Sequence, residues 1–358
     1  MASLMVESNN SINSIQILRG VASLAVVAFH CRWFLNGAYA EKSLGHILFD
    51  YGSFGVDMFF IISGFIITLA TRKGETIAQF AIKRFFRIYP LYIFCLILFL
   101  IFINEKYSMS DYIHALTITP LDQSSLAPYY GYNILAVSWT LSYEILFYVI
   151  FGISMVLSQK YRALICSIII TLLWLSSYHF TGSLTIDPVY TPTINLPINY
   201  VSNPITLNFI LGMLSYYIYS LFNIKNENLI FLLKAVSLFA ISLCFLGIAS
   251  RGMHHGIMMW GGMAFFIVTL LVILEKHGIN FYFKKPVYIG TISYSLYLVH
   301  PVILQFFRLE SMQFFNSTGF VKFFCMVLFS ISFAMITHRF IELPSQTIAR
   351  RICKKIDK

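Results

Sequence analysis

The sequence contains few charged residues. Asp, Glu, Lys and Arg make up 11% of its 358 positions, against about 25% in ordinary soluble domains. Hydrophobic residues make up 58%, and the mean hydropathy is +0.76. This composition excludes a soluble globular domain. The net charge of +10 does not indicate nucleic-acid binding, because the basic residues separate apolar stretches and no nucleic-acid motif accompanies them.

The sequence also lacks several patterns that would place it in other classes. The six cysteines show neither a CxxC pair nor metal-ligand spacing, so we interpret them as small hydrophobic residues and predict no metal site. The alternating segments of about 10 residues that are typical of a membrane β-barrel are absent. No basic region and cleavage site precede the first apolar stretch, so we expect that stretch to be retained as a helix.

Ten apolar stretches are candidates for membrane-spanning helices. They lie at about 14–34, 53–71, 90–104, 139–157, 162–180, 204–222, 228–249, 256–274, 287–307 and 320–341. With a cytoplasmic N-terminus, sixteen of the 25 Lys and Arg residues fall in inside segments and six in outside loops, as the positive-inside rule requires. The sequence therefore predicts an all-α integral membrane protein with about ten transmembrane helices and both termini in the cytoplasm. We expect one domain over residues 1–358, with a short basic tail at 343–358.

Two polar residues, Arg19 and His30, lie inside the first apolar stretch. A charge at membrane depth costs ~2.5–3.5 kcal/mol on insertion scales, so such residues usually face a polar cavity. Their separation of eleven residues is about three helical turns, which puts both side chains on one face, ~16 Å apart along the axis. The first helix is therefore expected to line an internal polar path at two depths. Alternatively, Arg19 reaches the interface and His30 bonds to a neighbouring carbonyl.

Three spans each contribute one polar residue near their outer end: His30, Asp57 and Glu144. We expect these three groups to share one layer of the outer leaflet, paired with one another or in a wet cavity, because unpaired groups there would be costly. A carboxylate beside a histidine fixes its tautomer and makes it a general base. A purely structural polar cluster is the alternative. Ser63 and Gly64, further along the second span, are expected to permit close helix packing.

The segment TIAQFAIKRFFRIY, at 76–89, is interpreted as a separate helix between the second and third spans. Thr76 and Gln79 form a predicted capping box, and Pro90 suits the first turn of the next span. Arg84 and Arg87 share a face. They either contact anionic lipid headgroups at the interface or form a cytoplasmic phosphate clamp, since arginine binds phosphate oxygens bidentately.

The late part of the chain carries two further polar motifs. His300 is followed by Pro301, which predicts a kink near mid-membrane, and we expect His300 to bond within that kink rather than to act in catalysis. Arg339 and Glu342 are expected near the cytoplasmic face as an ion pair or as capping groups. The long outside loops, at 105–138 and 181–203, contain many tyrosines, which suits either a sugar-like ligand or an ordinary interfacial belt.

Five segments together resemble the acyltransferase family 3 of integral membrane proteins. In order they are LRGVASLAVVAFH, GVDMFFIISGF, KRFFRIYPLY, SWTLSYEILFY and YSLYLVHP. The first four carry the residues that match the motifs of that family: Arg19, His30, Asp57, Ser63, Gly64, Arg84, Arg87, Trp139 and Glu144. The resemblance runs from Ser14 to Leu343 and is greatest to single-domain exopolysaccharide and nodulation-factor acetyltransferases. Many members have a second acidic residue in the fourth motif, whereas here Glu144 is the sole carboxylate.

The resemblance implies an O-acyltransferase of the cell (inner) membrane. It would move an acyl group, usually acetyl, from cytoplasmic acetyl-CoA to a hydroxyl of an extracytoplasmic sugar, glycan or lipid-linked saccharide. Its expected partners are thus acyl-CoA, that acceptor and membrane lipids, with no nucleic acid and no metal.

The resemblance also implies roles for particular residues. His30 would deprotonate the acceptor hydroxyl or briefly carry the acyl group, and Asp57 or Glu144 would orient it. Arg84 and Arg87 would bind the phosphates of CoA, whose pantetheine arm passes Arg19. The residues implied to contact the substrate are Trp139 and Tyr143.

Two other classes of function remain open at this point. A transporter or exporter could use the same His–carboxylate layer as a proton relay, although the chain shows no inverted repeat and no matching pair of broken helices. A non-catalytic assembly protein of a glycan-export system could keep the fold without the chemistry.

Overall fold

The chain forms a bundle of helices. The structure is a computed structural model that describes residues 12–103, 105–192, 197–250, 252–307 and 318–356, and this part of the chain contains no strand. Its α-helices are α1 (Asn13–Cys31), α2 (Leu44–Phe49), α3 (Phe54–Ala70), α4 (Ile77–Phe102), α5 (Met109–Thr117), α6 (Ser138–Leu157), α7 (Arg162–Thr181), α8 (Ile198–Val201), α9 (Leu207–Leu221), α10 (Glu227–Ile248), α11 (Trp260–Lys276), α12 (Lys284–Thr291), α13 (Ser293–Phe306), α14 (Phe320–Thr337) and α15 (Leu343–Ile356).

The helical membrane fold predicted from the sequence is confirmed. Eight helical segments in the described residues are long and apolar enough to cross a membrane, and a ninth is obtained if α12 and α13 form one bent span. The remaining predicted span, α11, is 17 residues long. Large apolar side chains cover the outside of the bundle, as on α10, where Phe231 and Phe239 are exposed. The count of ten and the cytoplasmic termini stay predictions.

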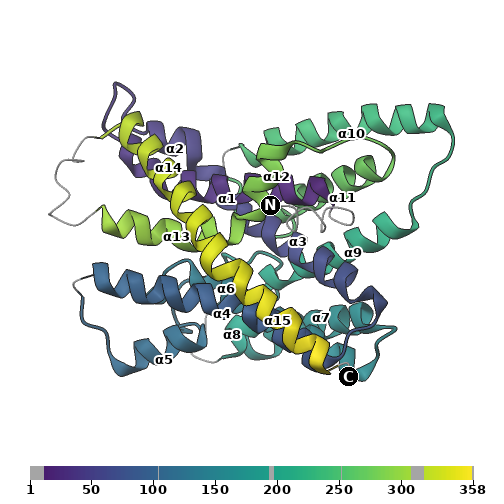
Figure 1. The fold of residues 1–358 in the computed structure, drawn as a ribbon, viewed down its shortest axis with the longest axis horizontal. Coiled ribbons are helices and arrows are strands. Elements are labelled where there is room, and N and C mark those ends of the chain that lie inside the picture. Colours follow the sequence, from purple (N-terminus) through teal and green to yellow (C-terminus); the bar gives the residue numbers. More distant parts are fainter. Residues whose placement is uncertain (1–11, 104, 193–196, 251, 308–317, 357–358) are drawn as a thin grey trace.

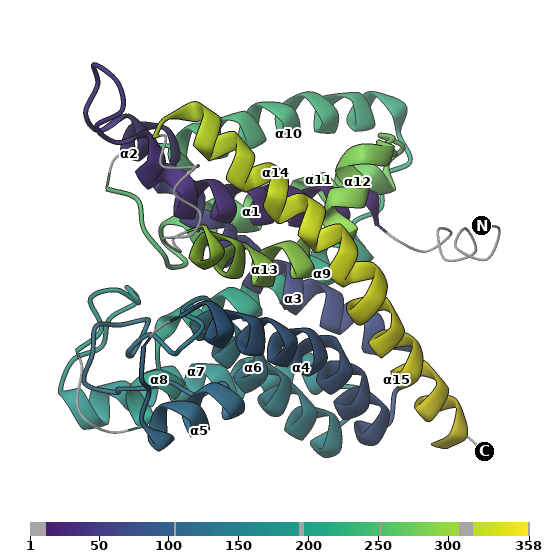
Figure 2. The same cartoon turned by 60° about the vertical axis from the view of Figure 1, so that its left-hand side comes forward.

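The helices fall into two groups, seen one above the other in Figure 2. The lower group contains α4 to α8, the upper group contains α1 and α10 to α14, and α3 and α9 lie between them (Figures 1 and 2). The long helix that α14 and α15 form crosses from the upper group to the lower one, where α15 packs on α4. The helix α2 lies at the opposite end of the bundle from the C-terminal part of α15 (Figure 2). We call the end with α2 and α8 the mouth.

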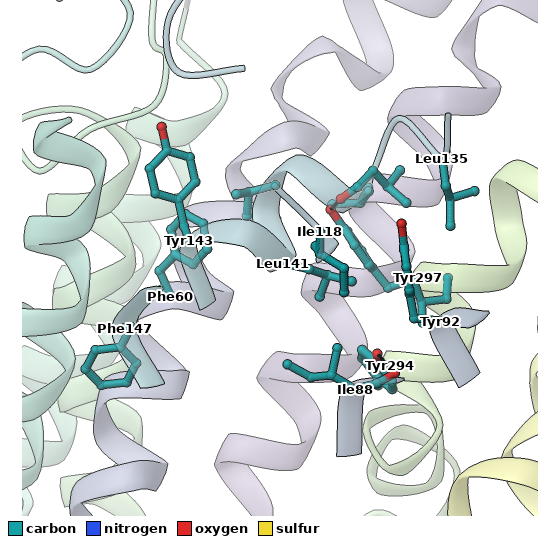
Figure 3. Packing of buried hydrophobic residues seen from close by; sticks show 14 of the residues in the cluster. Phe60, Ile88, Tyr92, Ile118, Leu135, Leu141, Tyr143, Phe147, Tyr294 and Tyr297 are labelled. Atoms are coloured by element: carbon teal, nitrogen blue, oxygen red, sulfur yellow. Dashed lines mark hydrogen bonds between the residues drawn. The ribbon is translucent and has the colours of Figure 1, made fainter. Parts of the chain in front are cut away.

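The predicted division at Pro90 is wrong, because one continuous helix, α4, runs through it. The capping box is confirmed: Thr76 accepts a hydrogen bond from the backbone N–H of Gln79, whose side chain accepts one from the backbone N–H of Thr76. The carbonyl of Ile88, two residues before the proline, accepts a hydrogen bond from Tyr294 (2.8 Å), and Figure 3 shows these two residues side by side. Arg84 therefore lies inside a spanning helix instead of on the membrane surface.

The sharp bend of the penultimate span is not at Pro301, where it was expected. The bend of 67° separates α12 from α13 at Ile292, and Pro301 lies inside α13. His300 still bonds locally, since its Nδ1 lies 3.2 Å from the carbonyl oxygen of Leu296. The bend turns the first residues of α13 into the interior of the bundle.

The chain continues as a helix beyond the last predicted span. A π-helical turn at His338–Glu342 joins α14 to α15, so the predicted basic tail is helical through Ile356, and residues 357–358 lie outside the described part. The ion pair between Arg339 and Glu342, one of the two arrangements expected for them, is not found in the described part of the chain. Glu342 is buried and accepts hydrogen bonds from Ser295 (2.7 Å) and Gln346 (3.1 Å), and it pairs with His338 (2.8 Å). Irregular turns of this kind often occur at functional sites.

Glycines set the distances between the central helices. A Cβ on Gly64 of α3 would lie 2.3 Å from the carbonyl oxygen of Phe209 on α9, and one on Gly290 of α12 would lie 1.7 Å from that of Gln16 on α1. Both helix pairs can therefore pack this closely only at glycine. The close packing predicted for Gly64 is confirmed. Between the helices, rings such as those of Phe60, Tyr143 and Phe147 fill the core (Figure 3).

Candidate active site

A cavity of about 180 Å³ lies among α1, α3, α4, α6 and α13, and all three arginines and the carboxylate that line it were singled out in the sequence. Three arginines line it, together with one carboxylate and several hydroxyl groups: Arg19, Arg84, Arg87, Glu144, Ser63, Thr140, Tyr148, Ser293, Tyr294 and Tyr297. We call it the arginine cavity. Its apolar lining comes mainly from α3, whose run of apolar residues spans the bundle.

The three arginines carry positive charge that the described residues leave largely uncompensated. None of them lies within 4.0 Å of a described carboxylate. The side chain of Arg19 donates to Gln16 (3.3 Å), the guanidinium of Arg84 lies 5.6 Å from the ring of Tyr148, and Arg84 Nε is buried without a hydrogen-bond partner. Arg87 interacts electrostatically with Tyr148 and with the carboxylates of Glu144 and Glu342, and Arg19 interacts with the same two carboxylates. Because buried charges are costly unless they are paired, the arginine cavity is suited to an anionic ligand.

Glu144 is held in place by two hydroxyl groups. Its Oε1 accepts hydrogen bonds from Ser63 of α3 (3.0 Å) and from Tyr148, one turn further along α6. Ser63 therefore does more than permit close packing, which was the role expected for it. The arrangement fixes the orientation of Glu144 in the same cavity as the arginines.

The prediction that His30, Asp57 and Glu144 share one layer is wrong. Gly55 of α3 packs against Ala22 and Val26 of α1, and the two helices run antiparallel. Asp57 therefore lies about eight residues, or ~12 Å along the axis, deeper than His30. Ser63, the partner of Glu144, lies six residues beyond Asp57, which places Glu144 ~9 Å deeper again.

The three depths differ because the spans do not begin at the same level. Residues 44–53 form α2 and a short 3-10 turn at the mouth before α3 starts. The 3-10 turn packs against the end of α1, so the first turn of α3 already lies inside the bundle. Hydropathy alone gives the length of a span and not the level at which it begins.

His30 contacts another histidine. Its ring lies 5.1 Å from that of His300 on α13, and neither Asp57 nor Glu144 is its hydrogen-bond partner within the described ranges. His300 is fully buried and its Nε2 has no hydrogen-bond partner there. The ring of Tyr297, which lines the arginine cavity, lies 5.9 Å from that of His300. Tyr297 and His300 therefore connect the cavity to His30.

Asp57 pairs with a histidine that the sequence did not single out. Its Oδ2 lies 2.7 Å from Nδ1 of His255, and its Oδ1 accepts hydrogen bonds from Asn208 Nδ2 (2.8 Å) and the backbone N–H of Gly256 (3.0 Å). Both members of the pair are buried. A weak signal for His255 exists: His254 and His255 adjoin Gly256 at the start of a span. Nothing local connects that loop to Asp57, nearly 200 residues earlier.

The two predicted substrate-binding aromatic residues lie outside the arginine cavity. The ring of Trp139 lies 5.7 Å from that of His255, toward the mouth. Tyr143 is buried in the core, where its hydroxyl donates to the carbonyl of Pro128 (2.9 Å). Trp139 is thus adjacent to the Asp57–His255 pair, whereas Tyr143 packs on the other residues of the core, with its ring 6.2 Å from that of Trp139.

Comparison with known proteins gives consistent matches. A family model described as an acyltransferase domain matches residues 12–339. The chain is 27% identical over 275 residues to the exopolysaccharide production protein ExoZ of Rhizobium meliloti (strain 1021), a match that covers 75% of this chain and 81% of that one. It is 34% identical over 79 residues to the acyltransferase MdmB of Streptomyces mycarofaciens, covering 21% and 20%. No solved structure gives a significant match.

Proposed function

This chain belongs to the acyltransferase-domain family, and on that premise we propose that it moves an acyl group from cytoplasmic acyl-CoA to a hydroxyl of an extracytoplasmic sugar or glycan. That it is an acyltransferase follows from the family. The donor, the acceptor and the direction of transfer are our proposal, with acetyl as the expected acyl group. The name of ExoZ connects that relative with exopolysaccharide production, which supports a polysaccharide or lipid-linked saccharide as the acceptor.

The excess positive charge of the three arginines in the cavity is the observation that carries the proposal. Arg84 and Arg87 lie about 10 and 15 Å from the start of α4, at the end of the bundle remote from the mouth. The donor phosphates would bind there through charge-assisted hydrogen bonds, inside the bundle and not at its surface as the sequence suggested. Arg19 lies ~16 Å along α1 from His30, a separation that the pantetheine arm of CoA would bridge.

His30 remains the proposed reacting group. In direct transfer, its imidazole accepts the proton of the acceptor hydroxyl while the hydroxyl oxygen attacks the acyl carbonyl, and the thiolate of CoA leaves and is protonated. In the two-step alternative, His30 first takes the acyl group and then passes it to the acceptor. His300, whose ring contacts that of His30, takes the neighbouring position that the sequence assigned to Asp57 or Glu144. The protein would act as a multi-pass protein of the cell (inner) membrane.

The direct test is acyl transfer by the purified protein in lipid nanodiscs. Radiolabelled acetyl-CoA is supplied with crude surface polysaccharide as the acceptor, and label in the polysaccharide is counted. Transfer that depends on CoA and is lost in His30→Ala is the expected result. A protein that binds acetyl-CoA but labels no polysaccharide would instead favour the transporter or assembly role, and unchanged transfer by His30→Ala would remove His30 from the reaction.

A further inference from the structure

The Asp57–His255 pair has a geometry that the proposed transfer leaves unused. Asp57 accepts three hydrogen bonds, all from donors that belong to other segments of the chain. Asn208 Nδ2 and the backbone N–H of Gly256 can only donate, and together with His255 they surround both carboxylate oxygens. Gly256 has a φ of 126°, which favours glycine and turns its N–H toward the carboxylate. The site is therefore built to hold one histidine in one orientation.

This arrangement fixes the tautomer of His255. A carboxylate that accepts three bonds requires Nδ1 of His255 to carry the proton, so in the neutral ring Nε2 is a hydrogen-bond acceptor. Nε2 of His255 has no hydrogen-bond partner among the described residues, and this atom is not fully buried. The pair thus offers one oriented acceptor atom to a ligand that can donate a hydrogen bond.

A row of aromatic rings leads from this atom to the surface. The ring of His255 lies 5.7 Å from that of Trp139, that of Trp139 lies 4.9 Å from that of Tyr129, and that of Tyr129 lies 5.1 Å from that of Tyr132. Tyr132 is 54% exposed, while Trp139 and Tyr129 are partly exposed. Burial raises the pKa of Tyr129, and the negative charge of Asp57 raises it further. The phenol of Tyr129 therefore stays neutral, and its hydroxyl can donate a hydrogen bond.

We propose that this row and His255 form the binding site for the acceptor, and that the acceptor presents a pyranose ring to it. One face of a pyranose consists of C–H groups, which the aromatic rings would cover. Its edge consists of hydroxyl groups, one of which donates to Nε2 of His255. Asp57 is a positioning residue that keeps this nitrogen in place. The inference rests on the proposed function, because it names the class of acceptor for the same transfer.

The location of the site agrees with this role. Trp139 is the second residue of α6, and His255 lies in the turn just before α11, so both are at the ends of helices that face the mouth. The level of Asp57 along α3 is between those of the arginine cavity and His30. A sugar bound here would lie on the side of the bundle away from the donor phosphates.

The test measures sugar binding directly. Saturation-transfer NMR is recorded on the full-length protein in lipid nanodiscs with methyl glucopyranoside, methyl galactopyranoside and methyl mannopyranoside. His255→Asn keeps a donor for Asp57 but removes Nε2, so binding of the preferred pyranoside should weaken roughly two- to ten-fold, the effect of one neutral hydrogen bond. His254→Asn is the matched control, because His254 bonds to Asp187 (2.6 Å) and lies outside the row. Its sugar affinity should equal that of the wild type.

Two results would overturn the inference: a wild-type protein that binds none of the three pyranosides, or His255→Asn with wild-type sugar affinity. If His255→Asn does not fold, Tyr132→Ala replaces it, since this exposed ring can be removed without opening the core. Unchanged sugar affinity in Tyr132→Ala would then overturn the inference. CoA affinity is measured on the same samples. Sugar binding without CoA binding would contradict the proposed function alone, whereas CoA-dependent transfer with no effect of His255→Asn would contradict the acceptor site alone.

Discussion

Replacing Arg84 with glutamine is expected to weaken CoA binding by roughly ten- to a hundred-fold, if one charge-assisted hydrogen bond worth ~1.5–3 kcal/mol is lost. Arg84 is suited to this test because it lines the arginine cavity, has a buried Nε without a hydrogen-bond partner and lies within 4.0 Å of no carboxylate in the described part of the chain. The substitution therefore removes a contact to the ligand without breaking an internal ion pair. Glutamine also keeps much of the length of the side chain.

The affinity is measured by calorimetric titration of CoA into nanodisc-embedded protein. Arg72→Gln is the matched control, because it makes the same change of charge at an exposed position in the turn after α3. Its CoA affinity should stay within about twofold of the wild-type value, since exposed charges contribute little. Pantetheine, which lacks the phosphates, should bind wild type and Arg84→Gln equally. An Arg84→Gln variant with wild-type CoA affinity would refute the phosphate role, and an equal loss in Arg72→Gln would show that only long-range charge is involved.

Two further predictions concern stability. Gly64→Ala should lower the melting temperature, because overpacking costs ~1–3 kcal/mol and the new Cβ meets a backbone carbonyl of α9 at 2.3 Å. Gly152→Ala should lower it less, because the nearest atom to its Cβ is the flexible end of Ile77 at 3.1 Å. Equal melting temperatures of the two variants would contradict this. Burial lowers the pKa of His254, but its hydrogen bonds to Asp187 and to the carbonyl of Gly252, together with the negative charge of Asp187, raise it more, so the pKa lies above its ordinary value. The stabilisation by His254 is therefore present below about pH 6.5 and is lost as the pH rises through the folded-state pKa. The melting temperature of His254→Asn should therefore fall less steeply with rising pH above about pH 6.5 than that of the wild type. The same pH dependence in both proteins would contradict this role of His254.

The membrane fold could be predicted because it depends on local composition. Apolar runs gave the second, fourth and fifth spans to within about one or two residues, and the capping box of Thr76 and Gln79 is a local pattern that the structure confirms. Arg19 lines a polar cavity, as expected, since a charge within a span is costly wherever it lies, whereas the phosphate-binding role of Arg84 and Arg87 stays a prediction. These inferences need no knowledge of how the helices pack.

The pairing of the polar residues could not be predicted, because it depends on the level and rotation of each helix. Gly55 lets α3 approach α1 at a level that separates Asp57 from His30 by ~12 Å along the axis. The bend at Ile292, which turns α13 into the cavity, has no proline of its own. His255 reaches Asp57 from a loop almost 200 residues away. A shared approximate depth in a topology diagram does not determine any of these contacts.

The central claim, acyl transfer to a surface glycan through His30, is tested most directly by mass spectrometry of that glycan. Cells that lack the protein, cells with the wild type and cells with His30→Ala at matched membrane abundance are compared for ester-linked acyl groups. We expect acyl esters only with the wild type, because loss of a general base lowers the rate by ~10²–10⁴ and loss of an acyl carrier abolishes transfer. An equal content of acyl esters in cells with and without the protein would contradict the account.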